Sequence, residues 1–212
     1  MRSDLSQEAI RLARLLLGLL PDEAEVMGLL GLMLLHDSHR LACVNDHGDL
    51  VPLDEQDRTL WNAAHVAEGC ALTEQALRTP AFGAYSLQAA ISAVHAESPT
   101  ALQTDWPQIV GLYDVLLSRE PSPVVALNRA VAVAMASDPA VGLALVAAPL
   151  KDESLQNYDL AHAAQADLFR RLGRRQEALG AYQHAVTLTS QAAEQRFLQR
   201  KMADIQSKLK NI

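Results

Sequence analysis

The sequence predicts an all-α protein, and three observations lead to this fold class. Half of the 212 residues are apolar, but only nine are aromatic and few segments alternate apolar with polar residues as a half-buried strand does. Ala, Leu, Gln, Glu and Arg are abundant, and these residues lose little free energy on entering a helix. Several Ser, Thr and Asp residues stand directly before a proline or three residues before a glutamate, as at helix starts.

These start signals divide the chain into ten predicted helices. The first such signal is Asp22 with Glu25, a capping-box pattern that follows Pro21. The others are Thr104 or Asp105 with Pro107 in the first turn, Ser122-Pro123 and Asp138-Pro139. The predicted helices cover residues 4–19, 22–42, 55–78, 83–97, 105–118, 123–136, 139–148, 157–172, 174–188 and 191–209. Short connections between them favour antiparallel pairs.

A pattern of small and aromatic residues repeats in the C-terminal half. The segment "HAAQADLFRRLGRRQEALGAYQHAV" has Ala166, Phe169, Ala178, Tyr182 and Ala185 in register. This spacing resembles the tetratricopeptide (TPR) pattern, in which small residues let two helices approach closely and an aromatic ring fills the gap. A looser copy lies upstream, at Ala130, Val133, Gly142 and Val146. We therefore expect one TPR-like domain over 1–212, with helix pairs stacked as a right-handed superhelix.

Within that domain, the repeats differ in clarity. Residues 121–212 hold two clearer units and a capping helix, whereas residues 1–120 hold divergent repeats with an insertion near 43–54. Near the N-terminus, the residues up to Pro21 match the second helix of a unit, and the residues from Leu30 match the first helix of the next. The chain thus begins halfway through a repeat, so we expect natural sequence upstream, or a helix that packs elsewhere. Leucines exposed on this first helix predict a homodimer.

Charge and cysteine content limit the classes of function. The net charge of −7 argues against a nucleic-acid binder, because phosphate contacts require a concentrated positive face. Arg11 and Arg14 interrupt the leucine-rich start, so no signal peptide or membrane span is predicted. Cys43 and Cys70 stand in apolar surroundings and are expected to be reduced, which is typical of a cytoplasmic protein.

The stretch "LLHDSHRLACVNDHGDLVPLDEQDRTLWN", residues 34–62, is dense in histidine and acidic residues. A metal site would draw on His36, Asp37, His39, Asp46 and His47. However, the chain lacks HExxH, paired CxxC and EF-hand spacing, and it also lacks a nucleophile elbow and a phosphate-binding glycine loop. We expect no metal, no cofactor and no enzymatic activity. The histidines of the following helices, His65 and His95, are expected to be buried and neutral.

The same stretch is better interpreted as a structural joint or an interaction surface. Its residues are His36, Asp37, Arg40, Asp54, Asp57, Arg58 and Trp61. Arg40, at one helix end, is expected to pair with Asp54 or Asp57 at the start of another helix, where both charges suit the helix dipoles. Trp61 would pack beneath this pair, and Arg58 would turn outward or complete the network.

Six blocks in order carry a resemblance to a known family. They are "PDEAEVMGLLGLMLLHDSHRLA", "DLVPLDEQDRTLWN", "LQAAISAVHAESPT", "TDWPQIVGLYDVL", "PSPVVALNRAVAVA" and "LFRRLGRRQEALGAYQHAVTLT". Together they resemble the TPR-like C-terminal extension of bacterial extracytoplasmic-function (ECF) RNA polymerase sigma factors. The family's promoter-binding and polymerase-binding modules are absent from this chain. The resemblance implies a domain that regulates transcription initiation through contacts with those sigma modules or with polymerase, without touching DNA.

The "NRAVA" block adds a candidate binding surface. Asn128 and Arg129 lie on a first helix of a repeat, the type that lines the concave face of TPR stacks. Asn and Arg there commonly bind a peptide backbone or carboxylate, although a cap or an inter-helix hydrogen bond explains them equally well. The alternative function is therefore a stand-alone TPR-like adaptor for a peptide or protein.

Overall fold

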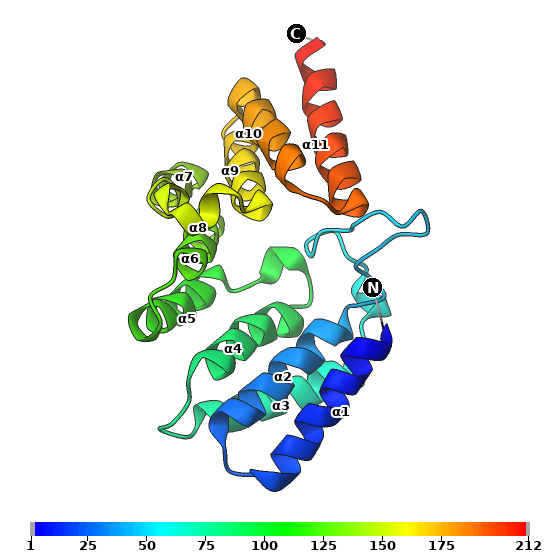
Figure 1. Cartoon of the computed structure of the whole chain (residues 1–212), viewed down its shortest axis with the longest axis vertical. Coiled ribbons are helices and arrows are strands. Elements are labelled where there is room, and N and C mark those ends of the chain that lie inside the picture. The colour runs from blue at the N-terminus through cyan, green and yellow to red at the C-terminus, as the bar shows by residue number, and fades with distance from the viewer. Residues whose placement is uncertain (1–2, 211–212) are drawn as a thin grey trace. The chain divides into compact units, whose positions relative to one another are not determined.

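The computed structural model describes residues 3–210 and is all-helical (Figure 1). No β-strand occurs within these residues, and the helices pack in stacked pairs, so the predicted all-α class is confirmed. The chain divides into two compact units. Unit 1 comprises Met1–Val44 and Val51–Glu120, and unit 2 comprises Asn45–Leu50 and Pro121–Ile212.

Unit 1 contains five α-helices and two short 3-10 helices among the described residues. The α-helices are α1 (Ser3–Leu19), α2 (Ala24–Ser38), α3 (Ala63–Leu77), α4 (Ala84–Glu97) and α5 (Trp106–Arg119). The 3-10 helices are η1 (Arg58–Leu60) and η2 (Ala101–Gln103). Helix α2 packs against α1, α3 and α4, and α5 packs against α4.

Helix α2 forms the core of unit 1 because it is apolar on every side. Its central sequence, "MGLLGLMLL", has no charged residue, and Leu30, Leu34 and Leu35 are at most 2% exposed. A helix without a polar face must be covered all round. Helices α1, α3 and α4 provide that cover.

Two glycines let the neighbouring helices come close to α2. A Cβ added at Gly28 would lie 2.5 Å from the backbone nitrogen of Ser86 on α4. A Cβ added at Gly31 would lie 2.9 Å from Thr73 Oγ1 and 3.1 Å from the carbonyl oxygen of Gly69, both on α3. Real Cβ atoms essentially never come closer than 3.0 Å to another atom, so the crossing at Gly28, which meets backbone, requires glycine. A Cβ at Gly31 would force the Thr73 hydroxyl to shift.

The carboxylate of Glu25 on α2 also holds the start of α4. It accepts hydrogen bonds from the backbone nitrogens of Gly83, Tyr85 and Ser86 at 2.9–3.0 Å and from Ser86 Oγ at 2.7 Å. The capping box predicted for Asp22 and Glu25 is therefore wrong. The N-cap of α2 is Glu23, which makes no side-chain cap bond, and Glu25 caps a different helix.

Unit 2 holds the remaining described helices. They are α6 (Pro123–Ala136), α7 (Pro139–Val146), the 3-10 helix η3 (Pro149–Lys151), α8 (Glu153–Gln156), α9 (Asp159–Arg171), α10 (Arg175–Leu188) and α11 (Ala192–Lys210). Each of the longer helices packs on its neighbour: α6 on α7, α7 on α9, α9 on α10 and α10 on α11. Among the described helices of unit 2, the two short ones, η3 and the single turn α8, have no counterpart among the predicted helices.

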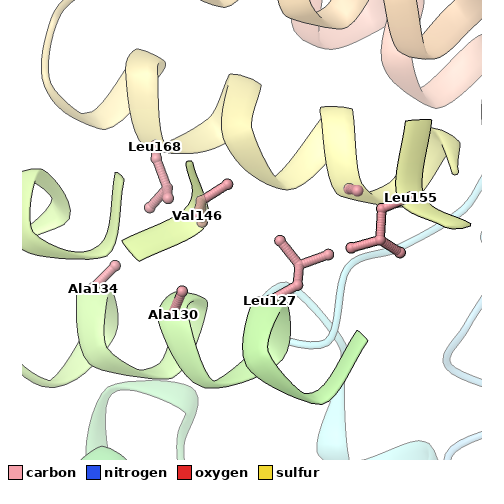
Figure 2. Close-up of a cluster of buried hydrophobic side chains, with 7 residues drawn as sticks. Leu127, Ala130, Ala134, Val146, Leu155 and Leu168 are labelled. Carbon is pink, nitrogen blue, oxygen red and sulfur yellow. The ribbon is translucent and has the colours of Figure 1, made fainter. Parts of the chain in front are cut away.

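The core of unit 2 follows the predicted small-residue pattern. Figure 2 shows Leu127, Ala130 and Ala134 of α6 facing Val146 of α7 and Leu168 of α9. At Gly142, an added Cβ would collide with the Cβ of Ala134, so α6 and α7 touch through small residues. Further along, the second cluster contains all five pattern residues of the clearer unit: Ala166, Phe169, Ala178, Tyr182 and Ala185.

The largest departure from the predicted helices lies around the insertion. Helix α2 ends at Ser38 rather than 42, and α3 begins at Ala63 rather than 55. The reason is that Asp57 caps only the 3-10 turn η1, after which Trp61 is extended. Asn62 is the true N-cap of α3, since its Oδ1 accepts from the backbone nitrogens of Ala64 and His65.

Candidate functional site

The polar groups of the predicted joint lie in unit 1, and Asp37 is their centre. One of its oxygens accepts from Ser6 Oγ of α1 at 2.9 Å and from Arg40 Nε at 3.2 Å. Its other oxygen lies 3.3 Å from His65 Nδ1 of α3. The Asp37 side chain is only 8% exposed. A single carboxylate on α2 thus contacts α1, α3 and the turn after α2.

The predicted pairing of Arg40 with Asp54 or Asp57 is wrong. Arg40 pairs with Asp37 three residues earlier, because the chain turns over residues 39–42 immediately after α2. Asp57 instead accepts from the backbone nitrogen and Oγ1 of Thr59, at 2.9 and 2.7 Å, and is exposed. These hydrogen bonds lower the pKa of Asp57 below its usual value. Asp54 is also exposed.

Arg58 and Trp61 turn inward rather than towards Arg40. Arg58 Nη1 donates to the backbone oxygen of His95 at the end of α4, at 2.7 Å, and its guanidinium stacks 4.5 Å from the centre of the Trp61 ring. The imidazole of His39 also packs on Trp61, and the two ring centres are 5.2 Å apart. Residues 58–61 are thereby tied to both α2 and α4.

The histidines around Trp61 favour the neutral form. His95 is half-buried and packs edge-on against Trp106 at 5.2 Å. Burial, followed by the charges of Arg58 and His39, lowers the pKa of His95 to about 4. Burial, then the nearby His36 and Arg58, also lowers the pKa of His39, while Asp37 opposes the shift. Both imidazoles are therefore uncharged at neutral pH.

A cavity of about 460 Å³ lies beside Trp61, within unit 1. Its walls come from the end of α2, the segment 53–61, α4 and α5, and they include His39, Gln56, His95 and Tyr113. A volume of this size is typical of small-molecule sites. No sequence pattern indicates that Gln56 and Tyr113 line a cavity, because the lining residues are spread over some eighty positions and share no motif.

The same region does not assemble a metal site from the described residues. Nowhere in 3–210 do three or more His, Cys, Asp or Glu side chains converge as metal ligands. His36 hydrogen-bonds Ser92, with Nε2 and Oγ 3.3 Å apart. His39 Nδ1 lies 3.2 Å from Cys43 Sγ, and burial raises the pKa of Cys43, so this sulfur stays a thiol. Cys43 and Cys70 form no disulfide.

Helix α1 carries an exposed apolar surface, which we call the leucine face. It consists of Leu5, Leu12, Leu16 and Leu19, which are 57, 52, 39 and 79% exposed. Their spacing of seven, four and three residues places them on one side of the helix. The opposite side, with Ile10 and Ala13, packs on α2.

The second candidate surface lies on α6 in unit 2. Asn128 is exposed and Arg129 is half-buried, whereas Leu127 and Ala130 beside them face the core (Figure 2). These two polar residues therefore lie on the outer side of α6.

Comparison with known proteins gives two matches. The model of a family of unknown function, DUF6596, matches residues 1–77, which cover α1, α2 and α3. An uncharacterized protein of Rhizobium meliloti (strain 1021) is 43% identical over 196 residues, or 92% of this chain. The chain spans 46% of the length of that relative.

No helix within 3–210 is long and apolar enough to cross a membrane.

Proposed function

We propose that this chain is a regulatory C-terminal domain of an ECF-type RNA polymerase sigma factor. It would act in the cytoplasm on transcription initiation, through protein contacts with the sigma modules or with polymerase. It would use no cofactor and catalyse no reaction. The ordered sequence blocks support this assignment, and the net charge of −7 disfavours direct contact with promoter DNA.

The observation that carries the proposal is the leucine face. Four leucines on one side of α1 are 39–79% exposed, whereas scattered single leucines are the norm on a protein surface. A face of this kind gains free energy when another protein covers it, at about 25 cal/mol per Å² of apolar area. The R. meliloti relative is about twice as long as this chain, and its additional sequence is one candidate for a segment that such a face contacts.

Affinity capture tests the proposed partner. The tagged chain is mixed with bacterial lysate and the retained proteins are identified by mass spectrometry. We expect polymerase subunits or sigma modules with the native chain, and at least a tenfold loss with Leu12→Gln, Leu16→Gln and Leu19→Gln combined. The matched control is Leu102→Gln, because Leu102 is 98% exposed but lies on η2, away from α1. Recovery of polymerase that does not depend on these leucines would contradict the docking face.

A stand-alone adaptor is the second candidate, and the exposed Asn128 favours it. An amide on the outer side of α6 can hold the backbone of an extended peptide. In the capture experiment, an unrelated client that is lost with Asn128→Ala and kept with the leucine variant would favour the adaptor over the sigma domain.

The purified chain, with no partner present, is expected to pair with a second copy through the leucine face. Light scattering would then give about twice the 23.0 kDa of the monomer, and the triple leucine variant would give the monomer mass. A native chain that stays monomeric at 100 µM, a test concentration on the order of that used for weak dimers, would contradict this prediction.

A further inference from the structure

Arg58 is a half-buried arginine that has no carboxylate partner among the described residues. Its Nη1 donates to the backbone oxygen of His95 at 2.7 Å, and its guanidinium stacks on the ring of Trp61. The carboxylate of its neighbour Asp57 is used to cap the turn η1. A charge that is partly removed from water usually has a counter-ion, so an arginine without one is unusual in this position.

The pKa values around Arg58 agree with an uncompensated charge. Burial lowers the pKa of Arg58 below its usual value. By contrast, the hydrogen bond with Glu8 raises the pKa of Arg11, which has a carboxylate partner. Burial, followed by the positive charge of Arg58, lowers the pKa of His95 to about 4. An anion placed at Arg58 would therefore gain a partner whose charge is not yet neutralised.

The free edge of the Arg58 guanidinium has the shape that binds a carboxylate. Because Nη1 is already used, Nε and Nη2 remain, and their N–H groups point in the same direction along one edge. Neither nitrogen is enclosed, since the enclosed side-chain nitrogens that lack a partner among the described residues belong to Trp61 and His65. Arg11 uses the same edge, with Nε and Nη2 donating to the two oxygens of Glu8 at 2.8 and 2.7 Å.

Arg58 lines a second cavity, of about 450 Å³, which adjoins the cavity described above and shares Trp61 and Ala96 with it. Its walls come from the segment 58–63, from α3 and from the end of α4. Val66, Ala67 and Ala96 give these walls small, apolar side chains. Such walls favour a ligand with a flat hydrocarbon body, which gains free energy when it leaves water.

The acid in the lining limits the charge of the ligand. Among the described residues that line the cavity, Glu97 carries a carboxylate. Burial, followed by the charge of Glu97, raises the pKa of Cys70 to about 11. A ligand with two negative charges would be repelled by Glu97 and would need more donors than the free edge of Arg58 supplies. A monocarboxylate has one charge and two oxygens, which match that edge.

We propose that this cavity binds a small aromatic monocarboxylate whose two oxygens accept hydrogen bonds from Nε and Nη2 of Arg58. The ring of the ligand would lie on the apolar side chains of α3 and α4. The ligand would thus supply the counter-ion that Arg58 lacks within the described chain. No described residue of α1 lines the cavity, so this site holds or fails independently of the leucine face and of the proposed function.

Benzoate is a suitable probe, and benzamide is its uncharged counterpart of nearly the same shape. Each compound is titrated into the 15N-labelled chain at low ionic strength, and the Arg58 Nε–H and Trp61 indole N–H signals are followed by NMR. Arg58→Lys and Trp61→Phe assign these signals. We expect both signals to move with benzoate and to saturate with a Kd on the order of 1 mM, as suits so small a ligand. Benzamide and inorganic phosphate should each bind about tenfold or more weakly.

Arg58→Lys separates the paired donors from the charge. Lysine keeps the positive charge but cannot present two parallel N–H groups, so benzoate should bind about tenfold more weakly, as measured on the Trp61 signal. The matched control is Arg119→Lys, which should leave benzoate binding unchanged. Arg119 also stacks on a ring, that of Phe82, and donates to the Phe82 backbone oxygen at 2.9 Å, but it is exposed and does not line the cavity.

If Arg58→Lys does not fold, Ala67→Leu tests the cavity instead. Ala67 is exposed on α3, so a larger side chain there narrows the cavity without entering the core, and it should also weaken benzoate about tenfold. The absence of a saturable shift with the native chain would overturn the proposal. Equal binding of benzamide would contradict recognition of the charge, equal binding by Arg58→Lys would contradict the paired donors, and tighter binding of phosphate would contradict the monocarboxylate.

Discussion

Unit 1 and unit 2 differ in how their helices are joined. In unit 1, polar side chains link segments far apart in the sequence: Glu25 reaches the start of α4, Asp37 reaches α1 and α3, and Arg58 reaches the end of α4. In unit 2, most ion pairs lie within one helix turn, as in Asp167 with Arg170 and Arg171. There, apolar and small residues hold neighbouring helices together.

Unit 2 also has polar links between distant segments, and the clearest of them involves Asp49. Asp49 of the segment 45–50 accepts from Arg196 Nε at 2.8 Å and from Arg200 Nη1 at 3.0 Å, both on α11. Both arginines are nearly half exposed, so solvent screens these pairs and they add little stability. The packing of unit 2 therefore depends on a repeating pattern, whereas that of unit 1 depends on single positions.

Tyr182→Ala should have the largest effect and should be confined to unit 2. Tyr182 is 2% exposed between Ala166 and Ala178, so losing its ring should lower the free energy of unfolding by about 4 kcal/mol. Both tryptophans lie in unit 1, so their fluorescence reports that unit alone. We expect urea unfolding by circular dichroism to shift while the fluorescence midpoint stays in place. Equal shifts in both signals would mean that the units unfold together.

Gly28→Ala should instead destabilise unit 1. The new Cβ would meet the backbone of Ser86 and push α4 away from α2. This overpacking should lower the free energy of unfolding by about 3 kcal/mol. The tryptophan fluorescence midpoint should therefore move to lower urea. Gly180→Ala on α10 is the matched control, because nothing lies within 4 Å of its added Cβ. That change should stabilise the chain by about 1 kcal/mol, through helix propensity alone.

Asp37→Ala tests the joint at its centre. Removing this carboxylate takes away the ion-pair partner of Arg40 and the acceptor of the Ser6 hydroxyl bond, and it should lower stability by about 2 kcal/mol in thermal unfolding. Asp57→Ala is the control within the same joint, and should cost about 0.5 kcal/mol because Asp57 only caps an exposed 3-10 turn. A larger loss of stability with Asp57→Ala than with Asp37→Ala would mean that the joint is centred on the segment after residue 54 and not on Asp37.

Glu25→Gln should lower the free energy of unfolding by a smaller amount, about 1.5 kcal/mol, and this loss should depend on pH. Burial tends to raise the pKa of Glu25, but the hydrogen bonds from Ser86, Tyr85 and Gly83 outweigh it, so the net pKa is lowered. A lowered pKa in the folded state means that the stabilisation is complete above the unfolded pKa of about 4.3 and is lost as the pH falls through the folded value. The native chain and the variant should therefore differ at pH 7 and converge near pH 3.

Sequence patterns predicted the helices of unit 2 well because its core repeats. Pro123 and Pro139 mark the starts of α6 and α7, and the small residues from Ala166 to Ala185 occupy the expected contacts. The same reasoning failed for Glu25, since an acid three residues after Asp22 looks like a local cap. Nothing in the sequence indicates that backbone N–H groups at the start of α4 lie beside the Glu25 carboxylate in the folded chain.

The candidate site was predictable only in location. The sequence identified residues 36–61 as a polar joint, and Asp37, Arg58 and Trp61 do make contacts between segments there. It gave the wrong partner for Arg40, because nothing in the sequence showed that α2 ends four residues early. The cavity escaped prediction, since its walls come from four separate segments.

The apolar character of α2 also matters while the chain is being made. At roughly 5–20 residues per second, the ribosome completes α4 at Glu97 several seconds after α2 ends at Ser38. Until α3 is completed at Leu77, only α1 is available to cover a helix that has no polar side. Newly made α2 is therefore a natural target for chaperones that bind apolar segments, and slow translation between residues 38 and 97 would lengthen its exposure to aggregation.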